Sequence, residues 1–193
     1  MRIDMRALGG SEILAGDTNG MAALGRLVAQ VTSEPAKAEP VFLDFSGVEV
    51  ATASYLRASA LAFRDMVRGR RSTLYPVVAN INDAVRDEFA LLMYERGDVL
   101  MVCTLDPDGT VIKSGLIGEL DPKQRLTFEL VHERGETDAS ELMRAYGDRE
   151  HLRHTTAWNN RLAALVGRGL LMEITQGRAK RYRPIFGEIG NGR

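Results

Sequence analysis

Residues 155–170 read Thr155-Thr156-Ala157-Trp158-Asn159-Asn160-Arg161-Leu162-Ala163-Ala164-Leu165-Val166-Gly167-Arg168-Gly169-Leu170. The chain continues as Leu171-Met172-Glu173-Ile174-Thr175-Gln176-Gly177-Arg178-Ala179-Lys180-Arg181-Tyr182-Arg183-Pro184. The first stretch has the apolar spacing of an amphipathic helix that ends at glycine. The second predicts a short hairpin that is rich in basic side chains and turns at Gln176-Gly177-Arg178. This succession decides how the last third of the chain is expected to fold.

The two faces of the helix predicted within 155–170 differ in size and polarity. At 100° per residue, one face gathers four apolar side chains and is expected to be buried: Trp158, Leu162, Leu165 and Val166. The opposite face carries side chains that are small or form hydrogen bonds: Thr156, Asn160, Ala163 and Gly167. Trp158 is therefore expected in a core rather than stacked on a nucleic-acid base. The slim face suits the DNA major groove, about 12 Å wide, although a helix packed against another helix has the same pattern.

Two further helices are predicted before this one. Asp121 as N-cap and Pro122 at the first helical position start a helix that ends at Gly135. Thr137 or Asp138 caps the next helix, which carries an apolar stripe and is closed by a second glycine. The last third of the chain is thus expected to hold three helices followed by a basic hairpin.

In this layout, residues 121–186 resemble the winged helix-turn-helix superfamily. The resemblance implies binding to double-stranded DNA, with the third helix in the major groove. It implies that Thr156 and Asn160 read base edges, and a bidentate contact of Asn160 with adenine would contribute about 1–3 kcal/mol of discrimination. The DNA backbone would be held by Asn159, Arg161, Arg178, Lys180 and Arg181. Thr155 and Gln176 complete the predicted DNA-binding residues, and Arg178 alternatively enters a minor groove.

The distribution of charge agrees with a local nucleic-acid footprint. The whole chain has a formal net charge of -1, with residues 1–120 at -4 and residues 121–193 at +3. Residues 151–186 alone carry seven basic side chains and one acidic side chain. A cationic segment on a mildly acidic body favours a polyanionic partner. The alternative is a solvated surface whose charge is merely uneven.

Strands and helices alternate over residues 1–105, which predicts an α/β layer structure. Strands are expected over 1–8, 41–45, 74–79 and 99–105, and helices over 21–31, 54–67 and 84–96. Asp106-Pro107-Asp108-Gly109 is a strong turn signal, after which residues 110–112 are expected to return as a hairpin partner. Residues 106–120 are interpreted as a connecting hairpin or linker, and residues 187–193 as a flexible tail.

The segment Leu43-Asp44-Phe45-Ser46-Gly47-Val48-Glu49-Val50-Ala51-Thr52-Ala53-Ser54-Tyr55-Leu56 resembles the STAS superfamily, which includes the bacterial anti-sigma-factor antagonists. The resemblance covers residues 1–105. It implies an α/β STAS-like N-terminal domain followed by a C-terminal winged helix of the α+β class. Signalling members carry a phosphorylated hydroxyl at the position of Ala53, which has none. Thr52 and Ser54 are possible regulatory sites, but they are more simply explained as helix-capping residues.

Several classes of function find no support in the sequence. There is one cysteine, Cys103, in an apolar run, so we expect a buried thiol and no internal disulfide. Three histidines without a carboxylate or cysteine set at ligand spacing predict no metal site. No phosphate-binding loop and no catalytic constellation stand out, so we expect neither an enzyme nor a cofactor. No signal peptide or membrane-spanning run is found, and a cytoplasmic protein is expected.

The sequence therefore favours a sequence-specific DNA-binding transcriptional regulator from a bacterial cytoplasm. Its partners would be double-stranded DNA and a second copy of the chain, since two half-sites multiply the specificity of one small module. The STAS-like domain would form the dimer or receive a signal from a protein partner. The alternative is a protein-interaction module that binds a kinase or ATPase in a partner-switching system, with a winged helix that lacks DNA affinity.

Overall fold

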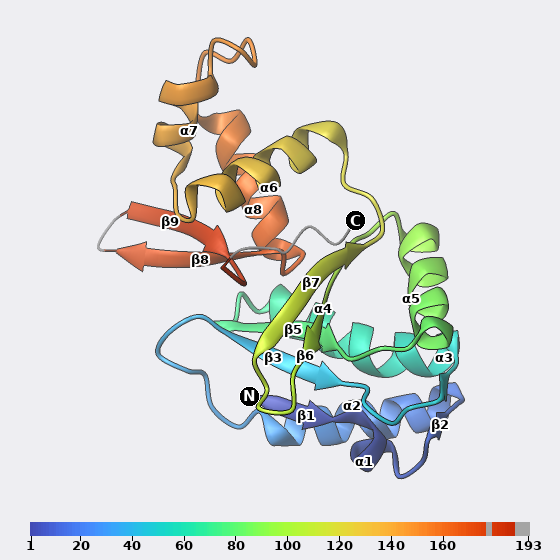
Figure 1. Cartoon of the computed structure of the whole chain (residues 1–193). Coiled ribbons are helices and arrows are strands. Elements are labelled where there is room, and N and C mark those ends of the chain that lie inside the picture. Colours follow the sequence, from blue (N-terminus) through green and yellow to red (C-terminus); the bar gives the residue numbers. More distant parts are fainter. Residues whose placement is uncertain (177–178, 188–193) are drawn as a thin grey trace.

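A five-stranded mixed sheet forms the centre of the protein (Figure 1). The computed structural model describes residues 1–176 and 179–187, without the side chain of Gln176. The strand order is β1-β3-β5-β6-β7. Four of these strands run parallel, namely β1 (Arg2–Asp4), β3 (Glu39–Asp44), β5 (Leu74–Ala79) and β6 (Leu100–Leu105). The edge strand β7 (Val111–Ile117) pairs with β6 in the antiparallel direction. The general expectation of an α/β fold is confirmed.

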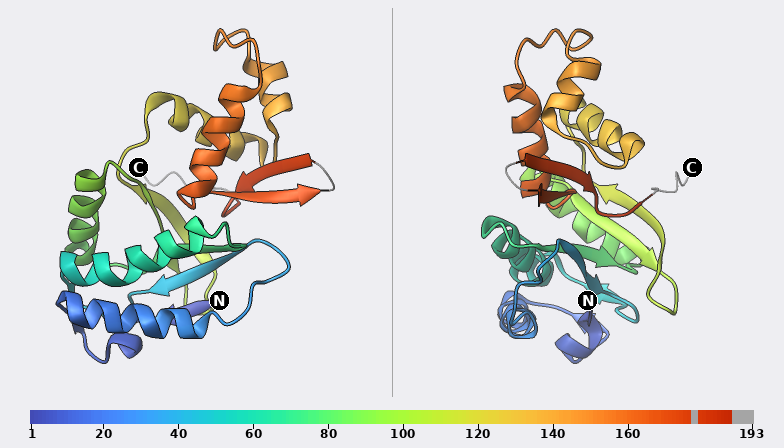
Figure 2. Two further views of the ribbon diagram at one scale, coloured as in Figure 1. Left: turned by 180° about the vertical axis from the view of Figure 1, so that it is seen from behind. Right: turned by 90° about the vertical axis from the view of Figure 1, so that its left-hand side faces the viewer.

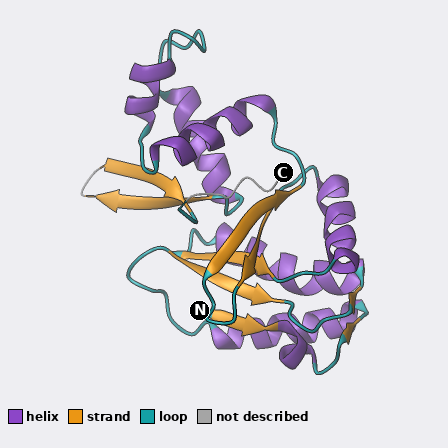
Figure 3. Cartoon of the chain, viewed as in Figure 1, coloured by secondary structure: helices purple, strands orange, loops and turns teal. Residues whose placement is uncertain are grey.

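Helices from the first half of the chain cover one face of this sheet (Figure 3). They are α2 (Asp17–Gln30), α3 (Ala53–Leu56), α4 (Ala62–Gly69) and α5 (Asp83–Arg96), with a π-helical segment, Arg57–Leu61, between α3 and α4. A short helix α1 (Met5–Gly9) and the two-residue strands β2 (Ile13–Leu14) and β4 (Val50–Ala51) lie at one end. The core on this face includes Leu27, Leu43, Phe63 and Phe89, all nearly inaccessible to solvent. These helices close one side of the sheet.

The last third of the chain packs against the other face of the sheet (Figure 2). It consists of α6 (Pro122–Arg134), α7 (Ala139–Tyr146), α8 (Thr156–Gly167) and a hairpin of β8 (Leu171–Gln176) and β9 (Ala179–Pro184). Along β5 the side chains alternate: Leu74 and Val78 belong to the first core, whereas Tyr75 and Val77 join a second core that contains Trp158. Because that second core contains side chains of the sheet as well as of the last third of the chain, these two parts form one packed body.

Some element boundaries differ from those predicted. Residues 1–8 were expected as one strand, but β1 ends at Asp4, whose carboxylate accepts a hydrogen bond from the backbone N–H of Ala7 at 2.9 Å and starts α1. The predicted connecting segment 106–120 contains β7, a full strand of the sheet. The bounds of α6 agree with the prediction, since Asp121 caps it and Gly135 ends it. Within the described residues, no helix is long and apolar enough to cross a membrane.

Candidate nucleic-acid interface

An isolated β-bridge joins the hairpin β8–β9 to the three-helix segment. Thr137, between α6 and α7, forms an isolated antiparallel bridge with Tyr182 of β9. The Thr137 N–H donates to the Tyr182 carbonyl at 3.0 Å, and the Tyr182 N–H donates to the Thr137 carbonyl at 2.8 Å. The adjacent Asp138 caps α7 by accepting hydrogen bonds from Ser140 and Glu141. The hairpin is therefore fixed to the segment that connects α6 and α7.

Helix α8 is oriented as its sequence pattern predicts. Trp158, Leu162 and Leu165 are fully buried in the second core, so the prediction that Trp158 belongs to a core is confirmed. The side chains on the opposite side form an exposed ridge, which we define as Thr156, Asn159, Asn160, Ala163 and Gly167. Val166, expected on the buried face, is only half-buried. The ridge therefore presents two amides and one hydroxyl on a helix that is firmly held from behind.

Arg161 was expected to contact DNA phosphates, but its surroundings inside the protein already occupy it. Only 10% of its side chain is exposed, and its Nη1 lies 3.2 Å from a carboxylate oxygen of Glu150. Its guanidinium also lies 4.8 Å from the centre of the Trp158 ring, in a cation–π contact. Arg161 thus covers the buried tryptophan. Thr155, which precedes α8, is half-buried, and its carbonyl accepts the N–H of Asn159 at 2.9 Å.

Arg181 of β9 is likewise engaged within the protein. Its guanidinium lies 2.5 Å from Glu136, 3.0 Å from Glu141 and 3.4 Å from Asp138. The hydrogen bond from Arg181 is the main reason that the pKa of the Glu141 carboxyl is lowered, and burial opposes it. Arg181 therefore fastens the hairpin to the segment that leads into α7. Three carboxylates already share its donors, so these donors are engaged within the protein and not free for the DNA backbone as predicted.

The other predicted hairpin residues divide into two groups. Lys180 is 56% exposed, and its ammonium lies 2.9 Å from Glu173, so it can still turn toward a polyanion. The Arg178 residue, and the side chain of Gln176, lie outside the described residues. The predicted phosphate contacts of the hairpin are thus reduced, within the described part of the chain, to Lys180.

A cleft of about 380 Å³ lies next to the ridge and joins the two halves of the chain. One wall comes from the loop at the end of α4 and the start of β5, including Arg68, Arg71 and Thr73. The other wall comes from α8 and the hairpin: Ala163, Val166, Gly167, Glu173, Thr175 and Lys180. The segment Arg68-Gly69-Arg70-Arg71-Ser72, at the end of α4, is rich in basic side chains. Nothing local in the sequence indicated that it lies against α8.

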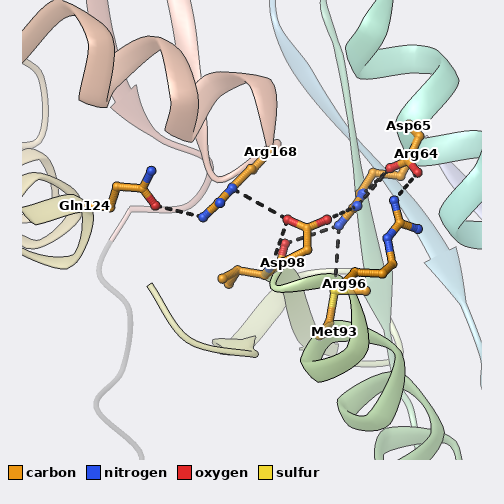
Figure 4. Close-up of polar contacts among 8 residues, drawn as sticks. Arg64, Asp65, Met93, Arg96, Asp98, Gln124 and Arg168 are labelled. Atoms are coloured by element: carbon orange, nitrogen blue, oxygen red, sulfur yellow. Dashed lines mark hydrogen bonds and ion pairs between the residues drawn. The ribbon is translucent and has the colours of Figure 1, made fainter. Parts of the chain in front are cut away.

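A network of ion pairs fixes the end of α8 to the first half of the chain (Figure 4). Asp98, which precedes β6, pairs with Arg64 of α4 and lies 3.6 Å from the Nε of Arg168, just after α8. Arg168 also donates to the side-chain oxygen of Gln124 in α6 at 2.8 Å. Arg64 is nearly buried and also pairs with Asp65 at 2.8 Å. The network links α4, α6 and the end of α8 through one carboxylate.

The two hydroxyl groups named as possible regulatory sites have structural partners. The Thr52 Oγ1 caps α3 by accepting a hydrogen bond from the N–H of Tyr55 at 3.4 Å, and it also accepts one from the N–H of Gly16, before α2, at 3.3 Å. Ser54 lies 3.1 Å from the same oxygen. The helix-capping interpretation is therefore confirmed for Thr52, whereas Ser54 lies inside α3 and is not its cap. No modification needs to be invoked to explain these two hydroxyls.

Comparison with known proteins adds no further identification. No protein-family model matches the chain, and no curated protein is significantly similar to it in sequence. Among the residues that the structure describes, no three His, Cys, Asp or Glu side chains are grouped as a metal site would require. The interpretation of function therefore rests on the geometry of α8, the hairpin and the neighbouring cleft.

Proposed function

We propose that the protein is a sequence-specific DNA-binding transcriptional regulator, in which residues 121–186 act as a winged helix. The single observation that carries this proposal is the exposed ridge of α8. Its back is held by Trp158, Leu162 and Leu165, while Asn159 and Asn160 face solvent. A helix with a slim polar side can enter the major groove without losing its packing against the protein. The bridge between Thr137 and Tyr182 supports the proposal, because it fixes the hairpin to the segment between α6 and α7.

In this proposal the ridge reads bases and the neighbouring cationic groups hold the backbone. Asn160 forms a bidentate contact with an adenine edge, and Thr156 contacts a neighbouring base. Asn159 and Lys180 contribute phosphate contacts, which position the helix but carry no sequence information. Arg161 and Arg181 act through the fold, since they hold Trp158 and the hairpin in place. Each base contact is worth about 1–3 kcal/mol, so one copy of the chain reads only a short half-site.

Selection from a random duplex library, followed by fluorescence anisotropy on the enriched sequence, tests the proposal. We expect enrichment of a defined sequence and affinity that decreases steeply with salt. Asn160→Ala should weaken binding to the enriched duplex and relax the preference at one base position, with little effect on random duplex. Asp87→Ala, an exposed change on α5, serves as the control. Absence of enrichment together with undetectable binding at low salt would overturn the proposal.

The first half of the chain, in the same proposal, is a STAS-like domain that brings two copies together or receives a signal from another protein. Dimerisation would double the number of base contacts, because a palindromic site presents two half-sites to a twofold symmetric protein. Light scattering of the chain, alone and with the enriched duplex, measures this directly. Two chains per duplex are expected, and one chain per duplex at saturation contradicts the dimer.

The alternative, a protein-interaction module without DNA affinity, is favoured by one specific observation. Arg161 and Arg181 are both paired with carboxylates, so the described hairpin and helix expose less positive charge than the sequence suggests. A kinase or ATPase would then bind the STAS-like half. The two functions are separated by the salt dependence of duplex binding: a protein-interaction module shows none, whereas a regulator loses affinity with a slope set by its phosphate contacts.

A further inference from the structure

The basic loop at the end of α4 lies beside the ridge of α8, although the two are far apart in sequence. The Nε of Arg68 donates to the carbonyl of Val166 at 3.2 Å, across 98 positions of the chain. Arg71 on the loop and Ala163 and Gly167 on the ridge line the same cleft. The loop therefore borders the surface that α8 would present to a duplex.

The loop is held in position by a buried arginine, Arg68, in the last turn of α4. Arg68 is 6% exposed, and its Nη1 donates to the carbonyls of Ser72 and Leu74, both at 2.8 Å. Its guanidinium also lies 3.9 Å from the centre of the Tyr75 ring. On the outer side, the Ser72 hydroxyl donates to Glu34 at 2.8 Å. Because the loop is fixed before any partner binds, little backbone conformational entropy would be lost on binding.

Two arginines project from this fixed loop without internal partners in the described part of the chain. Arg70 and Arg71 are exposed, and neither forms an ion pair with a residue that the structure describes. Two carboxylates lie nearby. Glu173 is paired with Lys180, and Glu34 accepts hydrogen bonds from Ser72 and from both the N–H and the hydroxyl of Thr73. The loop thus offers two positive charges whose neighbouring acids are already engaged.

We propose that Arg70 and Arg71 bind phosphates of the same duplex whose major groove receives α8. The proposal rests on the proposed function and assigns part of the DNA interface to the first half of the chain. Ala163 and Gly167 have no long side chains, so a phosphate strand can pass over this end of the ridge toward the loop. The ion pairs of Asp98 and the contact from Arg68 hold both parts of the surface in one frame.

The test compares the salt dependence of duplex binding for three double variants of the full chain. Arg70→Ala/Arg71→Ala removes the two loop charges. Arg86→Ala/Lys113→Ala removes two exposed charges at another surface, where both residues line a hollow between α5 and the β6–β7 pair. Thr156→Ala/Asn160→Ala, on the ridge, reports the proposed function itself. Circular dichroism and Trp158 fluorescence establish that each variant is folded.

Each phosphate contact contributes about 0.9 to the slope of log affinity against log salt concentration, so two contacts contribute about 1.8. Between about 50 and 200 mM salt, the affinity advantage of the unaltered protein over Arg70→Ala/Arg71→Ala should therefore shrink about twelvefold. The Arg86→Ala/Lys113→Ala variant should keep the slope of the unaltered protein. We expect Arg70→Ala/Arg71→Ala to weaken binding to random and enriched duplex alike, because phosphate contacts carry no sequence information.

Two failures are distinguishable. If the unaltered protein binds duplex and Thr156→Ala/Asn160→Ala weakens it, but Arg70→Ala/Arg71→Ala leaves affinity and slope unchanged or binds more tightly, the loop proposal is overturned and the regulator proposal stands. If the unaltered protein does not bind duplex at any salt concentration, both proposals fall. A smaller slope that Arg86→Ala/Lys113→Ala reproduces also overturns the loop proposal, since it would reflect overall charge rather than a local contact.

Discussion

Replacement of Asp98 by alanine should destabilise the protein far more than removal of a surface carboxylate. Asp98 is the shared partner of Arg64 and Arg168, and its side chain is 16% exposed. Arg64 is 5% exposed, so the variant would leave a nearly buried guanidinium with one carboxylate fewer. The same carboxylate also accepts the N–H of Val99 at 2.8 Å. The change therefore removes the ion pair with Arg64 of α4, the ion pair with Arg168 at the end of α8, and the hydrogen bond from Val99.

The magnitude follows from what Arg64 retains. Breaking a buried ion pair by removing one partner costs about 3–5 kcal/mol when nothing else compensates the remaining charge. Arg64 still pairs with Asp65 and donates to the carbonyl of Val99 at 3.2 Å, so the expected cost falls to the bottom of that range or below it. Arg168 is more exposed and adds little, because solvent screens its charge. We expect Asp98→Ala to lower the free energy of unfolding by about 2–3 kcal/mol.

Urea denaturation followed by circular dichroism and by the fluorescence of Trp158, the only tryptophan, measures this cost. With a slope of about 2 kcal/mol per molar urea, the midpoint should fall by about 1–1.5 M. Glu95→Ala is the matched control, since Glu95 and Arg57 are both more than half exposed and 3.7 Å apart. That change should cost about 0.5 kcal/mol or less. If Asp98→Ala costs no more than Glu95→Ala, the network does not hold the two halves together.

Further predictions concern the glycines of α2 and two buried groups of the sheet. Gly20→Ala would place its Cβ 2.8 Å from the Cβ of Ala58 and should destabilise the protein by about 1–3 kcal/mol. Gly25→Ala meets open space and should stabilise the protein by about 0.5–1 kcal/mol. Equal effects of the two variants in thermal unfolding would refute this packing. Burial, with a contribution from Asp44, raises the pKa of the Cys103 thiol to about 12, so a thiol reagent at pH 8 should label it only after unfolding, and rapid native labelling would contradict this. Burial opposes ionisation of Asp44, but the hydrogen bonds to its carboxylate outweigh burial and lower its pKa. The stabilisation by ionised Asp44 is therefore present above the pKa of the unfolded chain and is lost as the pH falls below about 4. Asp44→Asn should flatten this acid dependence of stability, and an unchanged acid profile would argue against it.

The parts of the fold that could be predicted are those specified by neighbouring residues. Asp121, Pro122 and Gly135 delimit α6 because capping and termination act within one helical turn. The buried and exposed sides of α8 followed from helical periodicity alone. The short helix α1 was not predicted, because Asp4 is both the last residue of β1 and the N-cap of α1. The apolar spacing of residues 1–8 also fits a strand equally well.

The candidate site was predicted less completely, because the partners of its charged side chains lie far along the chain. Arg181 meets carboxylates at Glu136 and Glu141, 45 and 40 positions earlier. The loop from Arg68 to Ser72 reaches α8 only because the last third of the chain packs on the second face of the sheet. A count of basic residues in a segment cannot distinguish a cation that is paired inside the protein from one that faces solvent. Exposure and pairing therefore had to come from the structure.

The shared second core restricts how the proposed binding to DNA could be regulated. A rotation of the three-helix segment relative to the sheet would expose Tyr75 and Met101, which are 2% exposed, and break the contacts of Asp98 and Arg68 with the end of α8. Exposing each large apolar side chain costs about 1.5–3 kcal/mol, whereas an effector commonly supplies about 1–3 kcal/mol of coupling energy in total. A signal received by the first half would therefore act on the arrangement of two copies, or on access to the ridge, rather than by reorienting α8 within one copy. Small-angle scattering of the free and duplex-bound protein, fitted with one rigid copy, would contradict this argument if the shape of a single copy had to change.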